Sequence, residues 1–199
     1  MKKGFIVLIV LLIAAFAIYQ WAVGFNNKAV ENEANAKTAW SNVESSYQRR
    51  NDLIGNLVKT VQGAADFERG TLTDVIEARA KATATSIDAN NLTPEKMAAF
   101  QEAQSGLTGA LGRLMVVVER YPELKANQNF LELQSQLEGT ENRINVARDR
   151  FNEQVNIYDI HTTQFPGKIL AGWFGFKEMA RFTADPGSEK APDVNFEFK

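Results

Sequence analysis

The residues of this sequence that could do chemistry are carboxylates and a single histidine, because the chain has no cysteine. Glu138 and Glu141 are three residues apart, so they would share one face of a helix, as the inward carboxylates of di-iron helical bundles do. Those centres also need a Glu-x-x-His unit on each of two helices, but Tyr158 stands three residues before His161. The spacing therefore favours surface charge pairs one helical turn apart, and a carboxylate-based metal protein or enzyme is the alternative.

Nucleophilic catalysis lacks its partners in this sequence. A serine or threonine nucleophile needs a neighbouring base, His161 is the only imidazole, and no Gly-x-Ser-x-Gly motif occurs. Three glycines recur at a spacing of three, at Gly106, Gly109 and Gly112, but they fall inside an expected helix and not in a phosphate-binding loop before one. We therefore assign no catalytic, cofactor-binding or metal-binding residue, and we expect a protein that is not an enzyme and holds no cofactor.

The same glycines predict an interaction surface. A helix face without side chains lets another backbone approach closely, so Gly106, Gly109 and Gly112 mark a packing surface, either inside the bundle or toward a partner.

Arg50 falls among apolar positions, where a charge has to be buried and paired. One interpretation is a residue that grips a ligand or acts as a switch. The favoured interpretation is an ion pair that fixes the register of the helices, with Glu119, Glu138 or Glu141 as the partner.

Residues 165–182 combine aromatic and basic side chains. Trp173, Phe174 and Phe176 lie beside Lys168 and Lys177. Such a segment could lie against lipid, dock a partner protein through an aromatic hot spot, or cap one end of the bundle core. The third interpretation is favoured.

Long helices must position these residues. Apolar positions step by four and three along residues 36–64, 97–121 and 130–158, which predicts three long amphipathic helices, and a shorter one is predicted over residues 71–87. Thr93-Pro94 and Asn127 are expected helix starts, Thr71 a further cap, and Tyr121-Pro122 a helix end. Strand-like alternation occurs only at Val194, Phe196 and Phe198. The fold class predicted is therefore all-α: an antiparallel bundle of about four long helices, preceded by one transmembrane helix.

The transmembrane helix is predicted from residues 4–25, an uncharged apolar run behind Lys2 and Lys3. It is long enough to cross a hydrocarbon core of about 30 Å. The alternative is a cleaved secretory signal, for which Ala15-Phe16-Ala17 provides the small-x-small spacing. The domains expected are a transmembrane signal-anchor at 1–25, a helical-bundle domain at 26–164, and an aromatic segment with an extended tail at 165–199.

The charged residues of the sequence restrict which partners the protein can bind and which side of the membrane its bundle lies on. A formal net charge of -2 without a basic stripe argues against nucleic acid. Lys2, Lys3 and the amino terminus carry the positive charge before the span, and Lys28 and Lys37 carry it after the span. The small excess before the span favours an amino terminus inside the cell and an extracytoplasmic location for the bulk of the chain.

Several segments, read in order, resemble the LemA family of bacterial membrane-anchored proteins. They are Ala39-Trp40-Ser41-Asn42-Val43, the stretch from Arg49 to Val58, residues 121–126 (YPELKA), residues 137–144 (LEGTENRI) and Phe174-Gly175-Phe176. The resemblance implies a short membrane helix carrying a helical bundle in the bacterial envelope, and it carries over no catalytic residue. Gly55 stands where relatives commonly have proline.

The function expected is that of a non-enzymatic scaffold in the bacterial envelope, anchored by one membrane pass. Its expected partners are the lipid bilayer, other membrane or envelope proteins, and a second copy of itself. A lipid-binding module acting through residues 165–182 is the alternative from another class.

Overall fold

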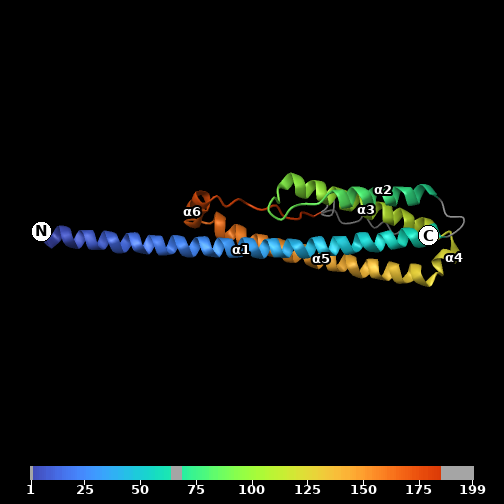
Figure 1. The fold of residues 1–199 in the computed structure, drawn as a ribbon, viewed down its shortest axis with the longest axis horizontal. Coiled ribbons are helices and arrows are strands. Elements are labelled where there is room, and N and C mark those ends of the chain that lie inside the picture. The colour runs from blue at the N-terminus through green and yellow to red at the C-terminus, as the bar shows by residue number, and fades with distance from the viewer. Residues whose placement is uncertain (1, 64–68, 185–199) are drawn as a thin grey trace, which may run out of the picture.

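The computed structural model describes residues 2–63 and 69–184. These ranges contain helices and no strands, which confirms the predicted all-α class. The predicted alternation at Val194 to Phe198 lies outside them. The helices are α1 (Lys2–Gln62), α2 (Arg69–Ala84), α3 (Pro94–Val118), α4 (Pro122–Lys125), α5 (Gln128–Thr163) and α6 (Gly167–Phe174) (Figure 1).

The 61-residue helix α1 runs without a break from the apolar run to the far end of the bundle (Figure 1). Its apolar part is long and hydrophobic enough to cross a membrane, and none of that window is buried inside the protein. The rest of α1 carries the predicted seam, which is buried at every described position: Ala36, Trp40, Val43, Tyr47, Arg50, Ile54, Leu57 and Val61. The seam also continues toward the span through Asn32, Ala29 and Phe25.

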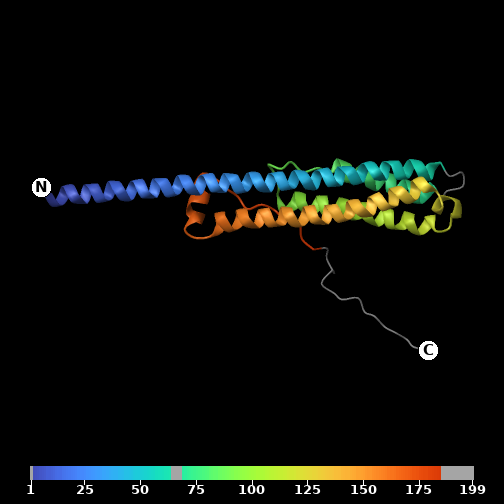
Figure 2. The ribbon, with the colours of Figure 1, turned by 90° about the horizontal axis from the view of Figure 1, so that it is seen from below.

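The other long helices pack along this rod. α5 runs beside α1 in the opposite direction over most of its length, and α2 and α3 form a second antiparallel pair (Figure 1, Figure 2). Aromatic rings fill the core nearer the span, where Trp40 lies 5.6 Å from Phe100 and 5.3 Å from Phe151 between ring centroids. Trp40 Nε1 also donates to the Ile87 carbonyl at 3.2 Å. Aliphatic residues such as Leu57, Leu107 and Leu114 fill the distal core.

Two predicted helix starts are confirmed and one is wrong. Thr93 caps α3 by accepting from the Lys96 amide, and the Asn127 side chain accepts from two amides at the start of α5. Thr71 is not a cap, because α2 already includes Arg69 and Gly70.

The chain after α5 turns back onto the bundle. Helix α6 ends at Gly175, which has φ = 80°, a left-handed conformation that favours glycine. The following segment then runs back along α5 to Phe182, whose ring is buried against Trp40, Phe100 and Phe151. Residues beyond position 164 thus contribute to the same core as the helices.

Candidate functional site

Arg50 lies at the centre of a small polar cluster between three helices. Its side chain is 4% exposed, and Nη1 lies 3.1 Å from the Glu141 carboxylate on α5 and 3.4 Å from Thr108 Oγ1 on α3. Nη2 donates to Gln104, also on α3. A small cavity of about 110 Å³ opens beside this cluster. Arg50 therefore ties α1 to both α3 and α5, and its pairing partner is half-exposed.

The other carboxylates singled out in the sequence do not reach Arg50. Glu119 is exposed and pairs with Lys125 near α4, and Glu138 accepts from Gln134 one turn away on α5. Among the described residues no group of three His, Cys, Asp or Glu side chains is placed to hold a metal ion.

The glycines of α3 face outward. Gly106, Gly109 and Gly112 are exposed, and the buried face of α3 consists of other residues, such as Leu107, Ala110 and Leu114. A Cβ atom built at Gly106 or Gly112 would meet nothing within 4 Å, and at Gly109 only the Arg113 side chain at 3.9 Å. Packing among the described residues therefore does not require these glycines.

The three aromatic residues predicted as an interaction surface, Trp173, Phe174 and Phe176, have different surroundings. Phe176 is partly buried, and its ring centroid lies 6.4 Å from that of Tyr158. Phe174 is 47% exposed, and Trp173 is 87% exposed. Of these three, only Phe176 thus lies against the bundle.

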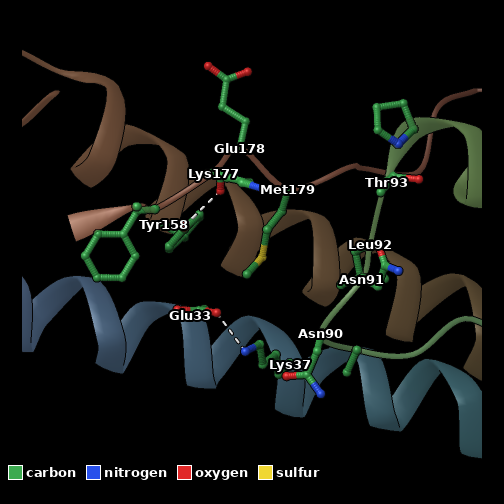
Figure 3. Close-up of a pocket in the computed structure, with 14 residues that line it drawn as sticks. Glu33, Lys37, Asn90, Asn91, Leu92, Thr93, Tyr158, Lys177, Glu178 and Met179 are labelled. Carbon is green, nitrogen blue, oxygen red and sulfur yellow. Dashed lines mark hydrogen bonds and ion pairs between the residues drawn. The ribbon is translucent and has the colours of Figure 1, made fainter. Parts of the chain in front are cut away.

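A polar pocket of about 310 Å³ lies between α1, the loop that precedes α3, α5 and the segment after α6 (Figure 3). Glu33 and Lys37 form an ion pair of 2.7 Å on its α1 wall. The Tyr158 hydroxyl donates to the Lys177 carbonyl at 2.8 Å on the opposite wall (Figure 3). Burial raises the pKa of Tyr158 to about 12, and the Glu33 carboxylate adds to the shift. Tyr158 is therefore a neutral donor at physiological pH.

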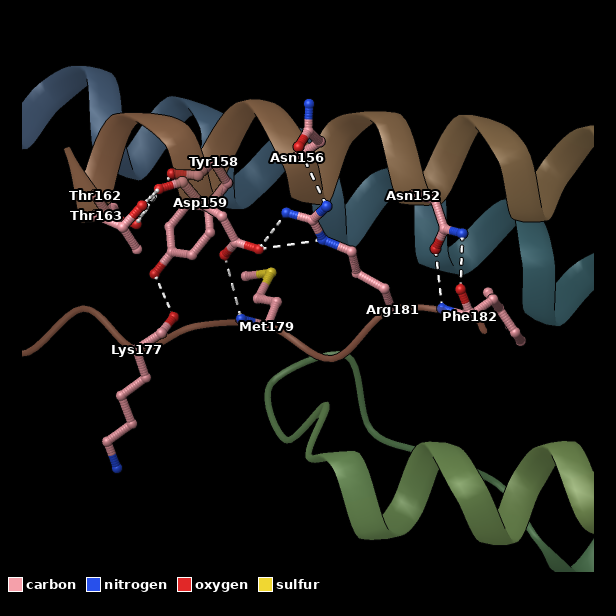
Figure 4. Close-up of polar contacts among 10 residues, drawn as sticks. All are labelled: Asn152, Asn156, Tyr158, Asp159, Thr162, Thr163, Lys177, Met179, Arg181 and Phe182. Carbon is pink, nitrogen blue, oxygen red and sulfur yellow. Dashed lines mark hydrogen bonds and ion pairs between the residues drawn. The ribbon is translucent and has the colours of Figure 1, made fainter. Parts of the chain in front are cut away.

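Helix α5 holds the segment after α6 through side chains that bind its backbone (Figure 4). The Asn152 amide donates to the Phe182 carbonyl at 3.0 Å and accepts from the Phe182 amide at 2.9 Å. Asp159 accepts from the Met179 amide and forms a 2.7 Å ion pair with Arg181. These contacts fix both the outer wall of the pocket and the position of Phe182 in the core.

Comparison with known proteins identifies the family. The sequence profile of the LemA family matches residues 39–196, most of the chain. This chain belongs to the LemA family.

Curated relatives of this LemA-family chain include two kinds of protein. Magnetosome protein MamQ of Magnetospirillum gryphiswaldense is 28% identical over 184 residues, covering 82% of this chain and 66% of that protein. Magnetosome protein MamQ 2 of Paramagnetospirillum magneticum is 29% identical over 170 residues, covering 75% of this chain and 61% of that protein. Protein LemA of Metamycoplasma hominis is 25% identical over 172 residues, covering 86% of this chain and 71% of that protein. This LemA-family chain thus spans less than two thirds of the length of either MamQ protein.

Sequence reasoning missed the pocket of this LemA-family protein. Its walls come from four separate segments of the chain, and no pattern in the sequence indicates that they meet. One available signal was Tyr158, a polar residue on an otherwise apolar seam, whose hydroxyl needs a partner when it is buried.

Proposed function

We propose that this protein is a non-enzymatic scaffold of the bacterial envelope, which holds a rigid helical bundle at a fixed position on the membrane and presents it to other proteins. The continuity of α1 carries this proposal. One helix forms both the apolar span and the longest element of the bundle, so no flexible linker separates anchor from domain. Such a connection suits a protein whose bundle must stand at a defined height and angle.

The surface proposed to meet protein partners is the glycine face of α3, made of Gly106, Gly109 and Gly112. Each glycine inside a helix costs about 1 kcal/mol relative to alanine, and among the described residues no neighbour approaches these three closely enough to require glycine. Val116, one turn beyond Gly112, is an apolar side chain that is 71% exposed. A helix from another envelope protein, or from a second copy, could approach this face closely.

The proposed topology places the bundle outside the cytoplasm, in keeping with the Lys/Arg distribution around the span.

Photo-crosslinking in cells tests the proposal. A photoreactive residue at Gly109 of the full-length protein is expected to give discrete protein adducts that mass spectrometry can identify. Ser135 is the matched control, because it is also a small, exposed residue of a long helix but lies on α5. Adducts at Gly109 that consist only of lipid or of crosslinks within a single protein molecule, or equal adducts at both positions, would reject the α3 surface.

A further inference from the structure

Helix α6 is docked against α1 where the apolar run ends. Leu170 and Ala171 of α6 form a small core with Phe25 and Ala29 of α1, and Ala22 packs against it. Gly167 permits this approach, because a Cβ atom there would lie 2.6 Å from Cε2 of Phe25. The His161 ring at the end of α5 also stacks on Phe25 at 4.5 Å. The small core and the close approach of Gly167 thus fix α6 at the last turn of the span, and the His161 stack fixes the Phe25 ring that they share.

The depth of α6 in a membrane follows from this docking. The uncharged run ends at Phe25, and Lys28 is the next charged residue along α1. Ala22 and Ala29 are seven residues apart, about 10 Å along a helix. A helix packed over this interval lies at the boundary between hydrocarbon and headgroups when the run spans the bilayer.

The side of α6 that does not face α1 is apolar and uncovered. Ile169 and Trp173 are four residues apart within α6, so they share one face of that helix, and Phe165 lies in the turn just before it. The side chains of Ile169, Trp173 and Phe165 are 63%, 87% and 83% exposed. Elsewhere in the described residues that follow the span, Val116 is the one large apolar side chain that is more than 60% exposed. The largest uncovered apolar side chains are therefore gathered at the membrane end of the bundle.

We propose that this surface, made of Ile169 and Trp173 of α6 and of Phe165 in the turn before it, is seated in the membrane interface as a second attachment point beside α1. The proposal rests on the anchoring part of the function proposed above. Figure 1 and Figure 2 place α6 at the end of the bundle from which the span projects, next to α1. Tryptophan and phenylalanine at this depth match the aromatic belt of membrane proteins, and the exposed Lys168 and Lys177 can meet lipid phosphates.

A second attachment restricts how the bundle moves. A single straight helix can tilt and turn about its axis in a bilayer, whereas a short helix fixed to it and seated in the interface opposes both motions. The partner of this face is thus the lipid surface, and its role is to set the angle of the bundle.

The absence of native cysteine makes the proposal testable by single labels on the full-length protein. Ile169→Cys and Trp173→Cys would each carry an environment-sensitive fluorophore in vesicles of phosphatidylethanolamine and phosphatidylglycerol. Quenchers would be a lipid with a nitroxide high on its acyl chain and a water-soluble iodide. Val10→Cys in the span is the lipid control, since its native side chain is exposed. Ser135→Cys near the distal end of α5 is the water control, since that residue is also exposed and lies away from the α3 glycine face.

Fluorophores at 169 and 173 are expected to lose most of their emission to the lipid nitroxide, while little of it is lost to iodide. Quenching by iodide alone would overturn the proposal, because the face would then be open to water. Protection from both quenchers would also overturn it, because protein would then cover the face. Failure of the nitroxide to quench at Val10 would instead reject the membrane span, and with it the anchoring that both proposals share. Circular dichroism of each labelled variant verifies that the helices are intact.

Discussion

At the residue scale, Arg50 shows how a charge can belong to the core of this bundle. Its guanidinium is almost completely buried, but the Glu141 carboxylate that it meets is 46% exposed. The two partners therefore stand in different dielectric surroundings, and their removal should not cost the same.

Arg50→Ala is expected to lower the free energy of unfolding by about 3 kcal/mol, because it opens a cavity and leaves Gln104 without its donor. Glu141→Gln should cost at most about 1 kcal/mol, since a half-exposed carboxylate contributes little. Urea unfolding of the protein in detergent micelles, followed by circular dichroism, measures both. Equal losses would mean that the ion pair, and not the burial of Arg50, determines the stability.

Tyr158 makes the stability of the fold depend on pH in the alkaline range. Its pKa is about 12 in the folded protein and about 10 in an unfolded chain. Between these pH values the unfolded state loses the proton first, so the free energy of unfolding falls as the pH rises. The fall approaches about 2–3 kcal/mol near pH 12. Stability below about pH 10 is unaffected.

Urea unfolding at about pH 9 and about pH 11 checks this dependence. The loss between the two pH values should be smaller in Tyr158→Phe than in the unaltered protein. Tyr121→Phe, at a part-exposed tyrosine, controls for the other groups that titrate in this range. The explanation fails if Tyr158→Phe and the unaltered protein lose stability equally.

At the element scale, the return of the chain after α6 depends on one backbone conformation. Gly175 has φ = 80°, whereas no positive φ is recorded at Gly172 within α6, and a Cβ atom would meet nothing within 4 Å at either position. Space is therefore equal at the two sites, and only the backbone conformation differs. Gly175→Ala should destabilise the fold by about 1 kcal/mol, and Gly172→Ala should stabilise it by up to about 1 kcal/mol. Opposite shifts in the thermal midpoint are the expected result; shifts of one sign would contradict it.

The sequence predicted the long helices better than the short ones, for a physical reason. The seam from Ala36 to Val61 repeats often enough for its period to be recognised. Helix α6 has eight residues, too few to show a period, and its position depends on contacts with Phe25 and Ala29, more than a hundred residues earlier. Phe182 was grouped with the aromatic segment for the same reason: nothing in its neighbours indicates that Trp40 and Phe151 surround it.

For the candidate sites, too, the pattern along one helix could be predicted, but the contacts between helices could not. Arg50 was recognised as a buried charge because its seam neighbours are apolar, and the α3 glycines because of their spacing. Three carboxylates were candidates for the partner of Arg50: Glu119, Glu138 and Glu141. Which of them meets Arg50 depends on how the helices are placed relative to one another, and the period of apolar residues along a helix gives no information on that. The outward direction of the glycines likewise required the position of α3 in the bundle.

At the scale of the whole molecule, the continuity of α1 through residues 25–29 couples the span to the bundle. Asn27 is exposed in this region, so its side chain can be replaced without opening the core. Asn27→Pro would remove the amide that bonds to the carbonyl of Val23 and would bring the proline ring against that carbonyl, at a local cost of about 3 kcal/mol. Asn27→Ala keeps the helix intact and is the matched control.

Distances between spin labels at Val10→Cys and Val116→Cys in lipid nanodiscs measure this coupling. A single narrow distribution is expected for the protein with Asn27 and for Asn27→Ala, because one rigid helix joins the two ends. In Asn27→Pro the distribution should broaden and move to shorter distances, since a kinked rod brings its ends closer together. An unchanged distribution in the proline variant would show that the contacts of α6 and His161 with Phe25 hold the two parts in place without a continuous α1. Rigidity would then belong to the packed junction, and the scaffold proposal would rest on α6 as much as on α1.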